Sequence, residues 1–220
     1  MKKHLNLLLK SAALLLLLAV PLQAAEGWTR FGPKPGLKSK VRIEGTSTMH
    51  DWRVESPLVG GYLEVGPNFP LQAGTDAKPG KVDARVDAFI PVGSLKSLEK
   101  DGTPYSTAMD DIMYEKLLKP AHPKILYRLS ELTLKEAPKT AGAPMVFDSA
   151  GELVVAGVTN KITMPVTITV SADKKMKITG TVAMKMTAFK IEPPAPKIAF
   201  GLIKTGDDVK LMFEWEIVGQ

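Results

Sequence analysis

Two neighbouring segments near the C-terminus, 161–171 and 175–188, alternate apolar and polar side chains almost without exception. Side chains of a β-strand point to opposite faces with a period of two residues, so each segment is typical of a strand with one apolar and one water-facing side. The apolar positions are Ile162, Met164, Val166, Ile168, Val170, Met176, Ile178, Val182, Met184 and Met186. Because little more than Asp173 and Lys174 separates the segments, they predict an antiparallel hairpin. Its broad apolar face needs a cover of other strands or an apolar ligand.

Further strands are predicted along the chain, and one stretch has a different period. The strand-like segments are 38–46, 49–55, 60–65, 82–92, 124–135, 146–156 and 209–217. Between Pro104 and Leu118, by contrast, apolar residues recur three and four positions apart, which predicts one helix of about 14 residues that ends before Pro120. About eight strands and a single short helix predict an all-β protein, either an antiparallel barrel or a sandwich. An eight-stranded barrel has room for side chains or for one small ligand, and periodicity does not distinguish a filled interior from a hollow one.

The N-terminus predicts export. Three lysines precede an apolar run at 14–20, and small residues follow it, a pattern typical of a secretory signal peptide over residues 1–25. An uncleaved N-terminal anchor is the alternative. Residues 26–37 contain Pro33, Pro35 and three glycines, so we expect an irregular lead-in, followed by one domain over residues 38–220. The chain contains no cysteine, so it has neither disulfides nor a lipid-modified cysteine. We therefore expect a periplasmic or secreted protein.

The charge gives little support for a nucleic-acid partner. The formal net charge is +6, and removal of Lys2, Lys3 and Lys10 with the signal peptide lowers it to about +3. Basic and acidic residues alternate through most of the remaining chain, whereas nucleic-acid binding requires a concentrated basic surface. We therefore expect no nucleic acid among the partners.

His50 and Asp51 form the most conspicuous polar cluster, yet they are poorly arranged for catalysis. A general base needs a carboxylate on its own side, and immediate neighbours in a strand point to opposite faces. Ser47 offers no better geometry, and the chain has no G-x-S-x-G nucleophile motif. His122 is the other histidine outside the predicted signal peptide, and two histidines without cysteine disfavour a zinc site. We expect neither a metal nor a cofactor, although a metal held by Asp and Glu alone is left open.

Short motifs follow one another through the chain from Lys38 onward. They are 45–52 (GTSTMHDW), 90–97 (IPVGSLKS), 109–114 (MDDIMY), 122–125 (HPKI), 151–153 (GEL), 157–161 (GVTNK), 186–194 (MTAFKIEPP) and 200–207 (FGLIKTGD). In this combination and order they resemble the YceI-like family of exported lipid-binding proteins. The resemblance implies an extended eight-stranded antiparallel barrel of lipocalin-like shape, whose interior holds a long polyisoprenoid or a similar amphiphile. It also implies a non-enzymatic protein. The His-Asp-Trp form of the first motif and the Ile-Glu-Pro-Pro end of 186–194 depart from the commoner pattern, and these differences concern the ligand rather than the fold.

The ligand is expected to contact side chains on the apolar faces of the barrel strands. The predicted ligand-binding residues are Ile90, Met164, Val166, Ile168, Val182, Met184, Met186, Phe213 and Trp215. Methionine is unbranched and adaptable, which suits an irregular ligand, although it also fills gaps in ordinary cores. Burial of hydrocarbon contributes about 0.8 kcal/mol per CH₂. A few isoprene units therefore outweigh an association cost of about 4–15 kcal/mol without any polar anchor.

We therefore expect an exported binding protein that holds a long apolar ligand, such as a polyisoprenoid, inside the barrel. A transient contact with the membrane and the oligomeric state are left open. Two alternatives belong to other classes of protein. One is a ligand-free structural or stress-protective envelope protein with a solid core. The other is an isomerase or hydrolase that uses His50.

Overall fold

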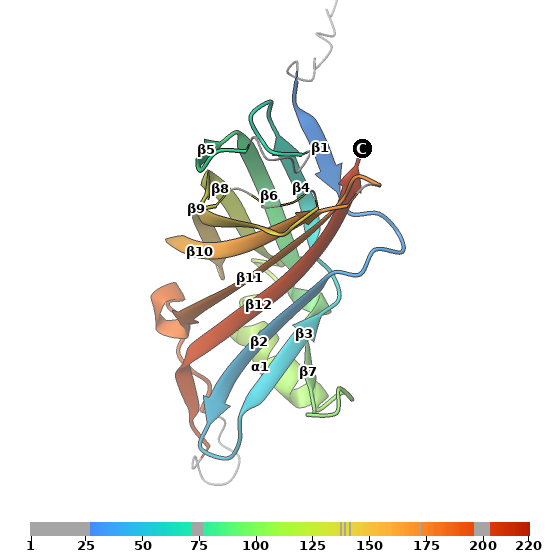
Figure 1. Ribbon diagram of the computed structural model, residues 1–220. Helices are drawn as coiled ribbons and strands as arrows, with labels where there is room; N and C mark the ends of the chain where they lie inside the picture. Colours follow the sequence, from blue (N-terminus) through green and yellow to red (C-terminus); the bar gives the residue numbers. More distant parts are fainter. Residues whose placement is uncertain are drawn as a thin grey trace, which may run out of the picture.

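The computed structural model describes residues 27–71, 77–136, 138, 140, 142–171, 173–195 and 203–220. The predicted signal peptide therefore lies outside the described residues. The described chain consists almost entirely of β-strands, as the alternating segments predicted (Figure 1). None of the helices in this part of the chain is long and apolar enough to span a membrane.

The elements follow one another in a simple order. The described strands are β1 (Thr29–Gly32), β2 (Lys40–Ser47), β3 (Trp52–Ser56), β4 (Gly60–Val65), β5 (Gly80–Val82), β6 (Ala84–Pro91), β7 (Lys96–Leu98), β8 (Lys124–Leu134), β9 (Met145–Val155), β10 (Val158–Val170), β11 (Lys175–Lys185) and β12 (Thr205–Gly219). The described helices are α1 (Thr107–Lys116) and two 3₁₀ turns, η1 (Val92–Ser94) and η2 (Met186–Phe189).

Eight strands close into an antiparallel barrel in the order β1-β4-β6-β8-β9-β10-β11-β12, which confirms the predicted fold class. β1 completes the ring because it pairs with β4 on one side and with β12 on the other. Phe31 lies opposite both Leu63 and Gly219 in these two pairings. The expectation of an irregular lead-in over 26–37 is therefore wrong for β1. Four residues are too few to display a period, and the prolines that follow them dominate the local composition.

A second group of strands extends the barrel at its other end (Figure 1). β12 is 15 residues long. Its C-terminal end pairs with β1, whereas its N-terminal part pairs with β2. β2 pairs with β3, and β3 pairs with β7. α1 packs against β7 at this end of the molecule. The extension therefore forms a wall continuous with the barrel, and α1 covers the open end between its strands.

Two predicted elements are shorter in the structure than the sequence pattern indicated. α1 has 10 residues rather than about 14, begins after the Ser106 cap, and ends before Leu118, whose φ of 52° is left-handed. The strand predicted over 175–188 stops at Lys185. The Asn160 side chain donates to the carbonyl of Ala188, and the Thr187 N–H donates to Asp207, so residues 186–189 form the turn η2 instead.

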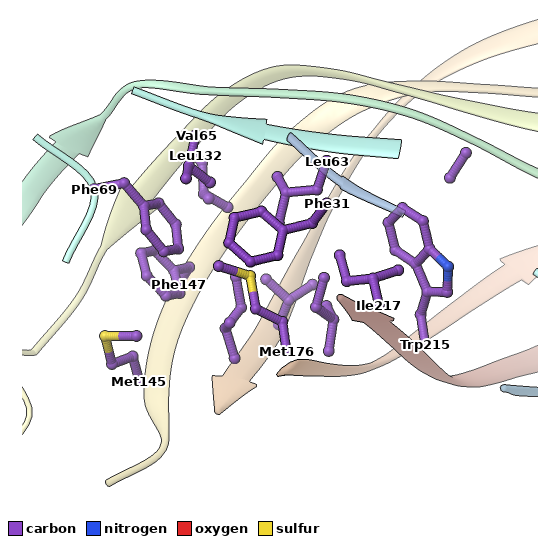
Figure 2. Packing of buried hydrophobic residues seen from close by; sticks show 14 of the residues in the cluster. Phe31, Leu63, Val65, Phe69, Leu132, Met145, Phe147, Met176, Trp215 and Ile217 are labelled. Carbon is purple, nitrogen blue, oxygen red and sulfur yellow. The ribbon is translucent and has the colours of Figure 1, made fainter. Parts of the chain in front are cut away.

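The end of the barrel that β1 closes is solid. Its buried core comprises Phe31, Leu63, Val65, Phe69, Leu132, Leu134, Met145, Phe147, Met176 and Ile217. Figure 2 labels all of these residues except Leu134 and shows how they lie in the core. The rings of Phe69 and Phe147 are stacked, with a centroid distance of 5.7 Å. We call this group the solid cluster. It blocks that end of the barrel with native-like packing, so a ligand has no room there.

Candidate ligand-binding site

An apolar cavity of about 110 Å³ lies in the middle of the barrel, next to the solid cluster. We call it the barrel cavity. The predicted ligand-binding residues on its wall are Ile90, Met164, Val166, Ile168, Val182, Phe213 and Trp215. Figure 2 shows Trp215 beside Ile217, at the edge of the solid cluster. Seven of the nine predicted residues thus share one cavity, because the period-two pattern turned each of them toward the barrel interior.

A second apolar cavity, of about 160 Å³, lies beneath α1. We call it the helix cavity. Met109, Met113 and Leu117 of the helical segment line it from one side, and the two remaining predicted residues, Met184 and Met186, line it from the other. Trp52, Phe189 and Ile191 also line it, and the sequence did not indicate them. Trp52 begins β3, Phe189 ends the turn η2, and Ile191 follows this turn.

The two cavities adjoin. Ile125, Leu153 and Leu211 lie on the walls of both, on three different strands of the sheet. The barrel cavity and the helix cavity therefore lie next to each other, separated at most by these three apolar side chains. We call this succession of apolar spaces the apolar path.

The register of β10, β11 and β12 explains why a cavity exists in the middle of the barrel. Val166 of β10 lies opposite Gly180 of β11, and Gly180 in turn lies opposite Phe213 of β12. A Cβ atom at Gly180 would come within 2.6 Å of the Phe213 ring. The ring therefore lies over the glycine instead of extending freely into the interior, which is a common reason for a glycine within a strand.

A buried hydroxyl pair interrupts the otherwise apolar wall of the barrel. The hydroxyl groups of Tyr127 and Ser149 are 2.7 Å apart, and Ser149 is only 3% exposed. Burial raises the pKa of Tyr127 above its ordinary value, and the hydrogen bond with Ser149 opposes that effect. Both residues line the barrel cavity. They were not predicted, because their contact depends on the pairing of β8 with β9.

A wide groove of about 860 Å³ opens to solvent beside the helix cavity. We call it the rim groove. Trp52, Arg53, Met109 and Val209 belong to the walls of both spaces. The outer wall is polar and carries both signs of charge. The apolar path therefore ends beside a polar groove that is open to solvent, an arrangement that suits a ligand with an apolar tail and a polar head.

The His50 cluster lies at the rim groove, where it shapes the turn between β2 and β3. The Ser47 hydroxyl accepts from the backbone N–H of Met49 and of His50, and it donates to the carbonyl of His50 at 2.8 Å. The Nδ1 atom of His50 is 2.8 Å from the backbone carbonyl of Asp51, so this contact involves the backbone of Asp51 and not its carboxylate. The Trp52 indole donates to the carbonyl of Thr46. Among the described residues, no three His, Cys, Asp or Glu side chains gather into a metal site.

Polar contacts fix α1 over the helix cavity. The buried Asp110 carboxylate accepts from the Ser97 N–H at 2.7 Å and pairs with the Lys96 ammonium at 3.1 Å. Burial opposes ionisation of Asp110, but the hydrogen bonds from Ser97 and Lys96 outweigh it and hold the pKa of this carboxyl below its ordinary value. The Tyr114 hydroxyl donates to the carbonyl of Leu95. The helix is therefore attached along β7, while its apolar side faces a cavity.

Comparisons with known proteins agree with this architecture. BcnA of Burkholderia cenocepacia has a similar fold, with a TM-score of 0.57 at 16% identity over 82% of this chain and 96% of that one. A polyisoprenoid-binding domain from Saccharophagus degradans, implicated in plant cell wall breakdown, also gives a TM-score of 0.57, at 11% identity over 88% of this chain and 99% of that one. No curated protein matches the chain. The sequence profile of the YceI-like domain matches residues 38–217, so the chain belongs to the YceI-like family.

Proposed function

We propose that this YceI-like protein binds a long apolar ligand, such as a polyisoprenoid, in the barrel and helix cavities. The observation that carries the proposal is the shared wall of the two cavities, formed by Ile125, Leu153 and Leu211. A path that is apolar along its length and opens at one end suits a flexible hydrocarbon chain. The solid cluster stops the chain at the opposite end. The tail therefore lies toward the solid cluster, and the head lies toward α1.

Hydrophobic burial supplies the affinity in this proposal. Burial of hydrocarbon contributes about 0.8 kcal/mol per CH₂. Five methionines line the two cavities: Met109, Met113, Met164, Met184 and Met186. Their unbranched thioether side chains adjust to ligands of irregular shape at small cost. Support for a binding role rather than catalysis also comes from the family and from His50, whose Nδ1 contacts a backbone carbonyl.

The same proposal places the protein outside the cytoplasm, in the periplasm or secreted. It rests on the lysines and the apolar run of residues 1–25, which we propose are removed as a signal peptide ahead of a barrel domain whose first strand is β1. The intact mass of exported protein tests this part. A mature N-terminus at Ala25 or Glu26 supports it, and a mass that retains residues 1–22 identifies the segment as an anchor.

Organic extraction of the protein purified from its own cell envelope, followed by mass spectrometry, tests the ligand. The expected result is a prenyl-type lipid in a stoichiometric amount. The matched control is a Val182→Trp variant purified in the same way, because an indole in the barrel cavity competes for the space of the ligand. Extracts of both proteins that contain no lipid would contradict the proposal and favour the ligand-free structural protein.

A further inference from the structure

The charged residues on the wall of the helix cavity are all cations within the described part of the chain. They are Arg53, Lys116 and Lys185, and no Asp or Glu belongs to this wall. Lys185 is already paired, because its ammonium lies 2.8 Å from the Asp208 carboxylate. Arg53 and Lys116 form no ion pair with any described carboxylate. Neither positive charge is therefore held in an ion pair, and the carboxylate that interacts electrostatically with Arg53, that of Asp101, lies on the wall of the rim groove.

Arg53 is also incompletely hydrogen-bonded. Its Nη2 atom donates to the backbone carbonyls of Glu99 and Lys100, which holds the guanidinium at the boundary between the helix cavity and the rim groove. Its Nε atom is buried and has no partner among the described residues. A buried donor on a charged group is costly to leave without an acceptor. An anion at this point would satisfy both the charge and the donor.

The rim groove beyond Arg53 has a different character. Asp51, Glu99 and Asp101 line it together with Lys100 and Lys210, so positive and negative groups are mixed there. An anion is therefore favoured where Arg53 borders the helix cavity rather than in the rim groove, because the wall of the helix cavity contains no carboxylate.

We propose that the ligand is an anionic amphiphile whose phosphate or carboxylate lies at Arg53 and Lys116 in the helix cavity, with its hydrocarbon tail in the barrel cavity. This inference rests on the proposed function and narrows its ligand class. Arginine matches the planar oxygens of such a head group in geometry as well as in charge. Arg53 thus determines specificity, whereas the apolar path supplies affinity without discriminating between head groups.

Two ligands with the same tail test the inference: geranylgeranyl phosphate and geranylgeraniol. Binding to the delipidated mature chain is measured from the fluorescence of the tryptophans, two of which, Trp52 and Trp215, line the cavities. The expected result is that the phosphate binds at least about tenfold more tightly than the alcohol, the effect of one charge-assisted hydrogen bond. Equal affinity of the two ligands would overturn the inference and leave the proposed function standing. Failure of both ligands to bind would contradict the proposed function itself.

Two variants and a control test whether Arg53 and Lys116 cause the preference for the phosphate over the alcohol. Lys116→Gln and Arg53→Gln should each lower the affinity for the phosphate by roughly three- to tenfold and leave the affinity for the alcohol unchanged. The Lys116 side chain forms no hydrogen bond or ion pair with a described residue, so Lys116→Gln tests the inference even if Arg53→Gln misfolds and loses both ligands. Lys161→Gln, on the exposed face of β10, is the matched control and should leave both affinities unchanged.

Inorganic phosphate distinguishes a head-group site from a site for a free ion. The expected result is that millimolar inorganic phosphate does not displace geranylgeranyl phosphate, because it lacks a tail to bury in the barrel cavity. Displacement of the lipid at phosphate concentrations comparable with the lipid's own would assign the cations to a free anion and overturn the head-group inference.

Discussion

Gly180 of β11 lies directly opposite Phe213 of β12, and the Phe213 ring occupies the space in which a side chain at Gly180 would begin. The carbonyl of Pro165 is the next neighbour, 3.3 Å from the same point. Because strand backbone crowds the position from one side, an added Cβ must push the aromatic ring toward the barrel cavity. The pair therefore sets the width of the cavity.

Replacement of Gly180 by alanine should reduce ligand binding more than it reduces stability. The displaced Phe213 ring takes up cavity space, and overpacking of this kind costs about 1–3 kcal/mol in a tightly filled core but less beside a void. We expect the urea midpoint to fall slightly and the affinity for a polyprenyl probe to fall clearly. The double variant Gly180→Ala with Phe213→Leu restores the space and should recover binding. An unchanged affinity in the single variant would mean that the ring does not border the bound ligand.

Tryptophan substitutions compare the cavity with the solid cluster. Val182 lies on the cavity wall and is only partly buried, so Val182→Trp in delipidated protein should change the urea midpoint little while it strongly reduces binding of a polyprenyl probe. Val166→Trp should show a weaker form of the same loss of binding. Val65 is fully buried in the solid cluster, so Val65→Trp should destabilise the protein by roughly 3 kcal/mol or more. If Val182→Trp proves as destabilising as Val65→Trp, the interior around Val182 is packed as tightly as the solid cluster and contains no ligand cavity.

The apolar side of α1 should control access to the helix cavity. Met113 lines this cavity, so Met113→Asp places a charge where the helix meets the apolar path and weakens the closed position of the helix. We expect faster transfer of lipid to vesicles, with the strand signal in far-UV circular dichroism retained. Glu115→Ala, on the exposed side of the same helix, is the control and should transfer lipid at the wild-type rate. A wild-type rate for Met113→Asp as well would remove α1 from the entry route.

Asp110 should stabilise the attachment of α1 in a pH-dependent way. Its folded pKa lies below the ordinary value of 3.8, so its contribution is present above that pH and is lost as the pH falls through the folded pKa. We expect Asp110→Ala to lower stability by about 1–3 kcal/mol near neutral pH, because the buried Ser97 N–H loses its acceptor. Urea midpoints measured from pH 2 to 7 should converge for the two proteins in acid. A constant difference across this range would show that the charge of Asp110 contributes nothing.

Strand interiors were predictable from the sequence because burial on one face imposes a period that single residues reveal. Val166 and Val182 were assigned to the interior on parity alone, and both line the barrel cavity. β1 was missed because its pairing with β12 depends on residues at the far end of the chain. The bounds of η2 were missed for a related reason, since Asn160 and Asp207 define this turn from other strands.

The polar residues of the site could not be predicted from the sequence. Arg53 is one residue of the short strand β3, and no motif in the sequence indicates that it binds a ligand. Its proposed role depends on a buried Nε atom and on a cavity wall without carboxylates. The Tyr127–Ser149 pair likewise depends on the alignment of β8 with β9. Such features arise where two or more elements meet. A periodic pattern along one element cannot indicate them.

The pairing of β1 with β12 sets the order in which this chain can fold. It joins Phe31 and Gly32 to Gly219 and Val218, so the barrel cannot close until almost the entire polypeptide has been delivered. The pairing of β2 with β12 in the extension likewise joins an early segment of the chain to a late one. Contacts of such high sequence separation form late, because the loop-closure entropy must be overcome first. A polypeptide that crosses a membrane through a translocation channel would therefore remain open during transit and complete its fold only on the far side.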